Sequence, residues 1–266
     1  MIPKVIHYCW FGGNEKNGMI KKCIDSWKIY CPDYEIIEWN ESNYDVEKNA
    51  FMKKAYASKK WAFVADYARI DILYRHGGIY LDTDVELVSK LDLFLQYNFF
   101  AGFESESFVS FGLGFGSEKE HPILKDILGY YDTLNFPDSE FELSLVSCPR
   151  IQTDALIKRG LVCNNQNQTL GDCHIFNTEY FCPKSFRTGE VRLTKNTVSI
   201  HHFDMSWSTK SSKKAKKMEW KLVRKYGQKW GRRISSIISL PGKLYRNAKD
   251  GTLLRYLLFL AKVRRK

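Results

Sequence analysis

The sequence predicts an α/β fold in which a mostly parallel sheet is covered by helices. Short β-branched and apolar runs alternate with longer segments that carry apolar residues at helical spacing. A repeated strand, helix, strand order requires crossover connections, which are typical of a single Rossmann-like domain. A strongly basic segment follows that pattern. We therefore expect one domain over residues 1–209 and a basic, amphipathic helical tail over residues 210–266.

The first part of the chain supplies three predicted strands with helices between them. The buried first strand ends at a Trp-Phe-Gly-Gly turn, and a break near Asn49 interrupts the second helix. Ser58 can cap the third helix, and Gly77 suits its C-terminal end. The expected elements are strand Ile2–Cys9, helix Met19–Tyr30, strand Tyr34–Trp39, helix Ser42–Ala57, helix Ser58–His76 and strand Ile79–Leu81.

The second part contains shorter predicted elements. A connection over residues 87–94 leads to a strand, and the Gly- and Phe-rich stretch after it is typical of a strand or loop that lines a pocket. The expected elements are strand Phe99–Glu104, pocket segment Phe108–Gly116, helix Pro122–Tyr131, a helix beginning at Thr153, and edge strands Ile175–Phe181 and Val191–His201.

Two carboxylates, Asp82 and Asp84, directly follow the third strand. One residue separates them, so in an extended chain both side chains point the same way. Such a close pair favours a hard divalent cation such as Mg²⁺ or Mn²⁺, which also binds diphosphate oxygens. About one D-x-D triplet is expected by chance in a chain of this size. We interpret the acid pair in Glu104-Ser105-Glu106 as a chance match of the same spacing.

Asp66 and Arg69 lie three residues apart on the predicted helix before this strand. They therefore share one face, and in an isolated helix they would form an exposed ion pair worth a few tenths of a kcal/mol. Together with the helix end, the two glycines and the D-x-D triplet, they form a long and specific string.

This string resembles a known family. The run V-A-D-Y-A-R-I-D-I-L-Y-R-H-G-G-I-Y-L-D-T-D is similar to the sugar-nucleotide signature of glycosyltransferase family thirty-two, which includes yeast mannosyltransferases and the catalytic cores of large clostridial glucosylating toxins. The opening I-P-K-V-I-H-Y-C-W-F-G and the late I-H-H-F-D-M-S-W-S also resemble it, so the resemblance spans roughly residues 1 to 209. The chain resembles most the small bacterial members that build capsular or exopolysaccharide.

The resemblance implies a GT-A-type fold and a retaining, metal-dependent glycosyltransferase. Such an enzyme would move a hexose from a nucleotide-sugar, of the UDP-Gal or UDP-Glc type, to a lipid-linked saccharide acceptor. A GDP-mannose-dependent α-mannosyltransferase is the alternative with the same site. A third reading, from another class, is a non-catalytic membrane-surface or nucleic-acid-binding protein that acts through the basic tail.

The resemblance also implies roles for individual residues. Mn²⁺ or Mg²⁺ would be held by Asp82, Asp84 and either His201 or His202, since an alternating strand lets only one histidine point inward. The family more often has T-G-P where this chain has Ser147-Cys148-Pro149. The expected catalytic residues are Asp82, Asp84, Arg69 and Asp66, and the expected substrate-binding residues are His7, Tyr8, Trp10, Asp66, Arg69, Tyr80, Asp82, Ser206 and Trp207.

Charge is concentrated in the tail. Residues 210–266 contain 19 Lys and Arg against two acids, a net of +17, so the rest of the chain carries about −6 of the total of +11. Basic helices that contain Trp, Tyr and Leu are typical of anionic membrane surfaces, and no nucleic-acid recognition motif accompanies the charge. We expect membrane contact and no nucleic-acid partner.

The cysteines and the N-terminus bear on the compartment. The seven cysteines form no C-x-x-C pair, which indicates free thiols in a reducing environment. Neither a signal peptide nor an apolar run of membrane-spanning length is visible. The sequence therefore predicts a cytoplasmic protein that is peripheral on the inner face of the plasma membrane.

Overall fold

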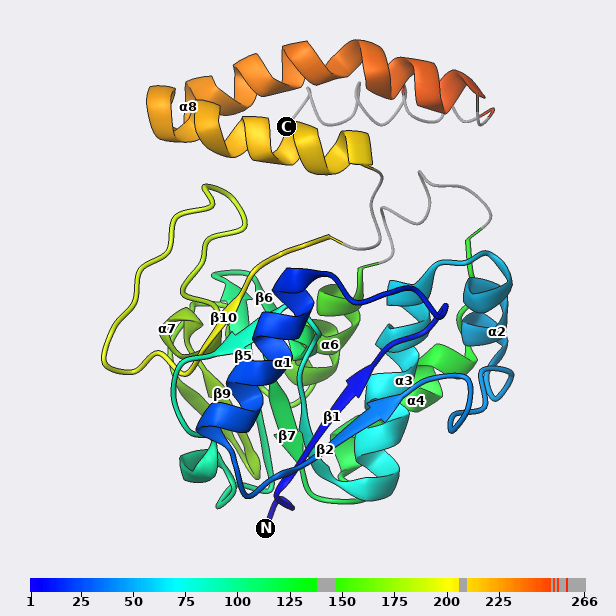
Figure 1. The fold of residues 1–266 in the computed structure, drawn as a ribbon, viewed down its shortest axis with the longest axis vertical. Helices are drawn as coiled ribbons and strands as arrows, with labels where there is room; N and C mark the ends of the chain where they lie inside the picture. Colours follow the sequence, from blue (N-terminus) through cyan, green and yellow to red (C-terminus); the bar gives the residue numbers. More distant parts are fainter. Residues whose placement is uncertain (138–146, 206–209, 250, 252, 254–256, 258–266) are drawn as a thin grey trace. The chain divides into compact units, whose positions relative to one another are not determined.

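The computed structural model describes residues 1–137, 147–205, 210–249, 251, 253 and 257 (Figure 1). The chain divides into two compact units, which we describe separately. The first unit contains Met1–Asn135, Cys148–Ser185 and Glu190–Trp207, and the second contains Phe136–Ser147, Phe186–Gly189 and Ser208–Lys266.

An eight-stranded sheet forms the centre of the first unit, with strand order β2-β1-β3-β7-β5-β9-β8 and β6 paired to β5. β1 is parallel to β2 and β3, and β5 is parallel to β9. β7 is antiparallel to both β3 and β5, so β1, β2, β3, β5 and β9 all run in one direction. This mostly parallel sheet confirms the predicted α/β class. The strands are β1 (Val5–Cys9), β2 (Glu35–Trp39), β3 (Gly78–Tyr80), β5 (Phe99–Ser105), β6 (Phe108–Ser110), β7 (Phe115–Ser117), β8 (Gln168–Leu170) and β9 (Cys173–Phe176).

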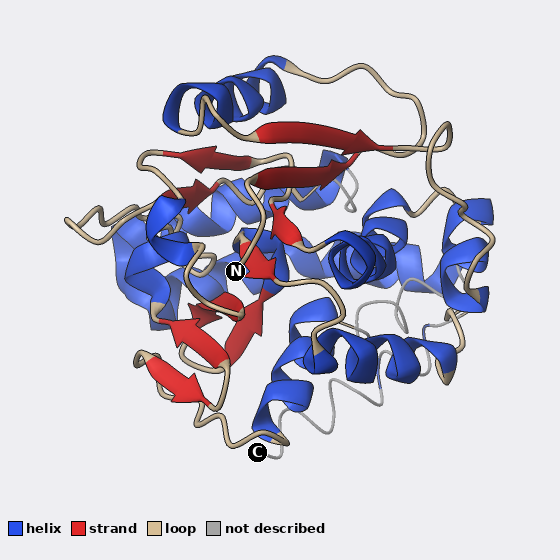
Figure 2. Cartoon of the chain, turned by 90° about the horizontal axis from the view of Figure 1, so that it is seen from below, coloured by secondary structure: helices blue, strands red, loops and turns tan. Residues whose placement is uncertain are grey.

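Helices pack around this sheet, as Figure 2 shows. α3 contacts β1, β3, α2 and α4, and α6 contacts β6. Burial of aromatic side chains dominates the core, where Phe99, Phe103, Phe111 and Phe115 are fully buried. The helices are α1 (Gly18–Tyr30), α2 (Ala50–Ala57), α3 (Trp61–His76), α4 (Pro122–Asp132), α6 (Cys148–Ile157) and α7 (Thr178–Phe181), with short 3₁₀ turns η1 (Asp92–Phe94) and η2 (Phe111–Leu113).

A second, two-stranded sheet joins β4 (Val85–Leu87) to β10 (Ser199–His201). The strands are antiparallel, and His201 lies opposite Val85. The indole N–H of Trp27 in α1 donates to the Val85 carbonyl over 2.8 Å, which fixes α1 against β4. This small sheet brings residue 201 next to the residues that follow β3.

Two glycines make the passage from α3 into β3 possible. Gly77 ends the helix at φ 67°, and its N–H donates to the Leu73 carbonyl over 2.8 Å. Gly78 has φ 103°, and a Cβ there would lie 2.8 Å from Nε2 of His7 and 2.9 Å from the Val5 carbonyl oxygen. Any larger residue at position 78 would push β3 away from β1.

Two predicted helix starts were wrong for the same reason, which is a competing cap. The helix expected over Ser42–Ala57 begins only at Ala50, directly after the break predicted near Asn49, because the Asn49 side chain accepts the N–H groups of Phe51 and Met52. Ser58 does not cap α3. It is the C-terminal cap of α2 instead, and α3 begins at Trp61.

Several later predictions also needed correction. The strand expected over Ile175–Phe181 ends at Phe176, because Asn177 caps the short helix α7. The strand expected over Val191–His201 is limited to Ser199–His201, and it pairs with β4 rather than with the large sheet. The helix expected from Thr153 begins at Cys148. Strands β4 and β8 were not predicted, since three-residue strands give almost no periodic signal.

The second unit is built on α8 (Lys210–Lys249), which is kinked at Gly227 with φ 75°. Beyond the kink the helix folds back, so that a Cβ on Gly231 would lie 2.5 Å from the Val223 backbone. Glu219 bridges the two segments by pairing with Lys216 at 3.2 Å and Arg232 at 3.8 Å. The expected helical tail continues through Pro241 to Lys249, and most residues beyond it lie outside the described part of the chain.

Candidate active site

The two aspartates of the D-x-D triplet lie in a turn between β3 and β4. The Val85 N–H donates to the Asp82 carbonyl over 3.0 Å, and the Asp82 N–H donates to the Gly112 carbonyl over 3.2 Å. The chain therefore does not stay extended here, contrary to the alternating strand that the sequence suggested. Even so, the carboxylates of Asp82 and Asp84 and the His201 imidazole offer ligand atoms within 4.8 Å of one another.

The structure separates the two candidate histidines. Nε2 of His201 lies 3.1 Å from Oδ1 of Asp84, whereas Nε2 of His202 lies 2.8 Å from Oε2 of Glu86. Glu86 also pairs with Lys22 at 2.7 Å. The two histidines thus point to different carboxylates, as alternation along a strand requires, and His201 is the one beside the D-x-D triplet.

Asp84 is the acid of the site whose ionised carboxylate is stabilised most strongly by its neighbours. Its Oδ2 accepts the Asp204 backbone N–H over 2.7 Å, and its own carbonyl accepts the His202 N–H over 2.9 Å. Burial would raise the pKa of Asp84, but His201 and the Asp204 N–H hold it well below its ordinary value. Burial would likewise lower the pKa of His201, yet the Asp84 carboxylate raises it. The contact with His201 therefore stabilises the ionised form of the Asp84 carboxylate.

Arg69 links the helix to the D-x-D triplet. Its guanidinium lies 3.0 Å from Asp66 and 3.0 Å from Asp82, and the residue is only 5% exposed. The ring of buried Tyr80 lies under the guanidinium at 5.0 Å, and its hydroxyl donates to Asp82 over 3.2 Å. The i, i+3 pair is thus part of a buried network and not the exposed ion pair that an isolated helix would present.

The acids around Arg69 are hard to ionise. Burial raises the pKa of Asp66 to about 6, although Arg69 acts in the opposite direction. Burial also raises the pKa of Asp82, with Arg69 opposing the shift and Asp84 adding to it. A cation that entered the site would stabilise the ionised forms of these buried carboxylates.

Gly112 leaves the space that the Asp82 carboxylate occupies. A Cβ at this position would lie 2.2 Å from Oδ2 of Asp82 and 3.0 Å from the Arg69 guanidinium. The predicted pocket segment, which includes Gly112, thus forms one wall of the site.

Cys148, which replaces the glycine of the T-G-P pattern, forms another wall. It contacts Asp66 and accepts a hydrogen bond from the Gln152 side chain over 2.7 Å.

The residues expected at the nucleotide differ in accessibility. The Tyr8 hydroxyl donates to Glu38, and the Trp10 indole donates to the Asn14 carbonyl over 2.7 Å. Lys16 lies over the Trp10 ring at 5.2 Å. Trp10 is partly exposed at the end of β1, where a base could reach it.

His7 lies deeper than a ligand-binding residue would. It is 2% exposed, its Nδ1 accepts the Trp39 indole N–H over 3.0 Å, and its Nε2 lies 3.0 Å from the Gly77 carbonyl. Burial lowers the pKa of His7 to about 4. Both ring nitrogens are engaged within the protein, so the contacts of His7 are structural.

The donor set of Asp82, Asp84 and His201 fits a divalent cation. Carboxylate oxygens suit Mg²⁺ and Mn²⁺, and an imidazole nitrogen favours Mn²⁺. Nδ1 of His201 is buried and has no hydrogen-bond partner among the described residues. The predicted substrate residues Ser206 and Trp207 lie outside the described residues.

Sequence reasoning missed three contributors to the site. The Asp204 N–H, the Glu86 carboxylate and the exact role of Gly112 depend on backbone positions or on the unpredicted strand β4. Of the three, only Gly112 could have been noticed in the sequence, because it is one of several glycines in an aromatic stretch.

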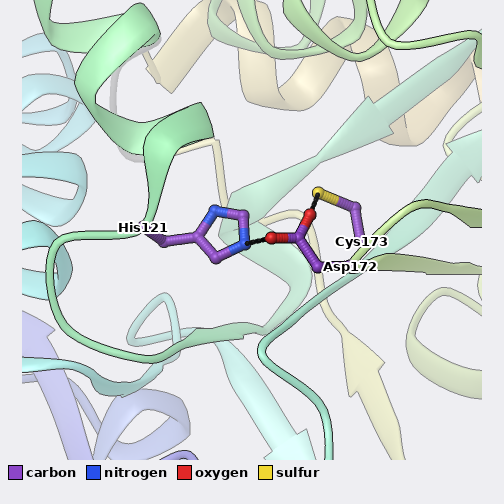
Figure 3. Close-up of side chains that lie close together, drawn as sticks. All are labelled: His121, Asp172 and Cys173. Atoms are coloured by element: carbon purple, nitrogen blue, oxygen red, sulfur yellow. Dashed lines mark hydrogen bonds and ion pairs between the residues drawn. The ribbon is translucent and has the colours of Figure 1, made fainter.

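A second cluster consists of His121, Asp172 and Cys173, whose side chains lie close together (Figure 3). Cys173 opens β9 and pairs with Phe99, which opens β5. Nδ1 of His121 accepts the Ile123 N–H at the start of α4, and its Nε2 lies 3.2 Å from Oδ2 of Asp172. A neutral ring with this cap carries its proton on Nε2, which lies beside the Asp172 carboxylate. The cluster therefore connects the start of α4 to the turn between β8 and β9.

Comparison with known proteins agrees with the part of the site that lies before residue 100. Residues 19–100, which include Asp66, Arg69, Asp82 and Asp84, match the family described as "Glycosyltransferase sugar-binding region containing DXD motif". The chain is 33% identical over 134 residues to inositol phosphoceramide mannosyltransferase 3 of Schizosaccharomyces pombe (strain 972 / ATCC 24843). That match covers 48% of this chain and 36% of the relative, so the chain spans about a third of the relative's length.

Solved structures give weaker similarities. PaToxG glycosyltransferase has a TM-score of 0.48 at 17% identity, covering 60% of this chain and 70% of that one. A glycosyltransferase involved in the glycosylation of the major capsid of PBCV-1 has a TM-score of 0.45 at 12% identity, covering 81% of this chain and 100% of that one.

Proposed function

We propose that this protein is a metal-dependent glycosyltransferase that moves a hexose from a nucleotide-diphosphate sugar to a saccharide acceptor. The observation that carries this proposal is the convergence of Asp82, Asp84 and His201 beside the Arg69 network. Three of these four residues lie in the segment that matches a glycosyltransferase sugar-binding region. A protein that acted only through its basic tail would have no use for this arrangement.

Asp82, Asp84 and His201 would hold the metal ion. A bound Mn²⁺ or Mg²⁺ supplies Lewis-acid stabilisation of the charge that develops on the leaving diphosphate. Arg69 would fix the Asp82 carboxylate through their 3.0 Å contact, and Asp66 would accept hydrogen bonds from the sugar hydroxyls. Ser206 and Trp207 are proposed to contact the phosphate and the glycosyl group.

The reaction exchanges one bond for another at the anomeric carbon. The bond from this carbon to the diphosphate oxygen breaks, a bond to the acceptor oxygen forms, and the acceptor hydroxyl loses its proton. We propose retention of configuration, hence an α linkage. No side chain is assigned as the base, since the leaving phosphate can accept the proton.

Two donor classes fit the same site. A UDP-hexose such as UDP-Gal or UDP-Glc is our first candidate, with Trp10, Tyr8 and Tyr80 near the nucleotide. GDP-mannose is the second candidate, and the similarity to a yeast mannosyltransferase favours it.

The experiment is a turnover assay with UDP-Glc, UDP-Gal and GDP-Man in Mn²⁺, Mg²⁺ or chelator, with wild type and Asp84→Asn. We expect turnover of one donor that requires metal and is lost in the variant. No turnover and no binding of any donor with either metal would contradict the proposed function.

The second unit is proposed to bind an anionic membrane that presents a lipid-linked acceptor, as in capsular or exopolysaccharide synthesis. Exposed apolar side chains on α8, such as Trp230 and Ile237, accompany its basic residues. None of the described helices is both long and apolar enough to cross a bilayer. We place the enzyme at the cytoplasmic face of the plasma membrane.

Co-sedimentation with vesicles tests this placement. We expect binding to vesicles that contain phosphatidylglycerol and none to pure phosphatidylcholine, because each Lys or Arg near an anionic surface contributes about 1 kcal/mol. Glutamate at the exposed Lys214, Lys217 and Lys221 should abolish the binding. Equal binding to both vesicle types would contradict the electrostatic attachment.

A further inference from the structure

Glu104 occupies a β-bulge at the carboxyl end of β5. Phe103 pairs with Val109 and Ser105 pairs with Phe108, so Glu104 has no counterpart on β6. Bulges redirect a side chain and are frequent beside active sites. The sequence suggested that Glu104 and Glu106 form a chance acid pair, but the structure separates them: Glu104 is partly buried, and Glu106 is exposed at the hairpin turn.

The Glu104 carboxylate lies close enough to the D-x-D cluster to interact electrostatically with it. The buried Ser110 hydroxyl hydrogen-bonds Glu104, and the carboxylate interacts electrostatically with His201 and Asp82. Ser110 directly precedes η2, whose Gly112 borders Asp82. Among the residues that the structure describes, Glu104 forms no ion pair with a Lys or Arg at 4.0 Å or less. A partly buried carboxylate that is not paired with a Lys or Arg is costly to ionise, and a ligand that donates hydrogen bonds to it would stabilise its charged form.

The position of β5 indicates which ligand this is. Ligands of α/β sheets bind beyond the carboxyl ends of the strands. Tyr8 and Trp10 follow β1, and the D-x-D triplet follows β3, whereas β5 lies further along the same sheet beyond β7. With the nucleotide at the β1 end and the metal at the β3 end, the β5 end is left for the acceptor.

We propose that the Glu104 carboxylate binds a neutral saccharide acceptor by accepting hydrogen bonds from its hydroxyl groups. This inference rests on the proposed transferase function. A carboxylate offers two oxygens and can accept from two neighbouring hydroxyls of one sugar ring. Because the Glu104 carboxylate is itself negative and interacts with Asp82, the same place disfavours an anionic acceptor. Glu104 would thus contribute both to acceptor orientation and to acceptor selection.

The test uses the full-length protein, the donor that it turns over, and three neutral probes: octyl glucoside, octyl galactoside and octyl mannoside. Glu104→Ala and Glu104→Gln are compared with Glu106→Ala and Glu106→Gln. We expect Glu104→Ala to raise the acceptor KM at least tenfold and Glu104→Gln to raise it at least threefold, as for loss or weakening of a charged hydrogen bond. The donor KM should change less than twofold, and both Glu106 variants should match wild type.

Three results would overturn the proposal. The first is a wild-type acceptor KM in both Glu104 variants. The second is a rise in the donor KM as large as the rise in the acceptor KM, which would place Glu104 at the donor. The third is wild-type protein that hydrolyses its donor but uses none of the neutral octyl hexosides.

Two further measurements keep the interpretation clear. Melting temperatures report folding, and the isosteric Glu104→Gln carries the test if Glu104→Ala fails to fold. Wild-type protein that neither binds nor hydrolyses any nucleotide-sugar would contradict the proposed function itself, a result distinct from all three above.

Discussion

Oδ1 of Asp84 lies 3.1 Å from Nε2 of His201, although the two residues are far apart in the sequence. The antiparallel pairing of β4 with β10 creates this contact, because it sets His201 opposite Val85. The second histidine of the pair reaches Glu86 instead. The small sheet therefore decides which imidazole belongs to the candidate metal site.

His201→Ala and His202→Ala should differ in metal affinity. We expect His201→Ala to weaken Mn²⁺ binding at least tenfold, because it removes a ligand. His202→Ala removes only a support of Glu86 and should change the affinity less. Titration of free Mn²⁺ by electron paramagnetic resonance measures both. A larger loss in His202→Ala would mean that the assignment is reversed.

Gly112→Ala tests the close approach of η2 to Asp82. The added Cβ would lie 2.2 Å from Oδ2 of Asp82, so the carboxylate must move. We expect a loss of at least tenfold in kcat/KM and a destabilisation of about 1–3 kcal/mol.

Gly129→Ala is the matched control, since it is exposed in α4 and its Cβ would meet nothing within 4 Å. It should stabilise the protein by up to about 1 kcal/mol through helix propensity and leave activity unchanged. An unchanged kcat/KM in Gly112→Ala would show that η2 and the Asp82 carboxylate can move apart without loss of activity.

His7 should make stability depend on pH. Burial lowers its pKa from 6.5 to about 4, so between these values the unfolded chain binds a proton that the folded chain does not. The contribution is fully present above pH 6.5 and is lost as the pH falls towards 4, which amounts to about 3 kcal/mol.

Urea unfolding at pH 7.5, 5.5 and 4.5 measures this loss. In His7→Gln the part of the pH dependence that His7 causes should disappear, whatever the absolute stability of the variant. An unchanged difference between pH 7.5 and pH 4.5 in His7→Gln would contradict the structural role of the buried ring.

The sequence predicted those parts of the molecule that local patterns encode. The α3 helix, its glycine end and the D-x-D triplet stand within twenty-odd residues, and the i, i+3 spacing placed Asp66 and Arg69 on one face. The burial of Arg69 and its contact with Asp82 could not be read from that spacing, because both depend on the packing of α3 against the sheet.

Long-range pairing accounts for what the sequence did not reveal. Strand β4 has three residues and gave no signal, yet its pairing distinguishes His201 from His202. The β-bulge in β5 distinguishes Glu104 from Glu106, and the spacing of residues in the sequence does not reveal where a bulge will form. His7 was expected among the substrate-binding residues, but strand alternation turns its ring towards Gly77 and Trp39.

Calorimetric titration of UDP and GDP in Mn²⁺ or chelator measures whether nucleotide binding depends on the metal site, using wild type, Asp84→Asn and the exposed control Asp154→Asn. We predict that wild type and Asp154→Asn bind one nucleotide only when Mn²⁺ is present, and that Asp84→Asn loses at least a hundredfold in affinity. Binding of equal strength in chelator, or in Asp84→Asn, would contradict the assignment of Asp82, Asp84 and His201 as the metal and diphosphate site.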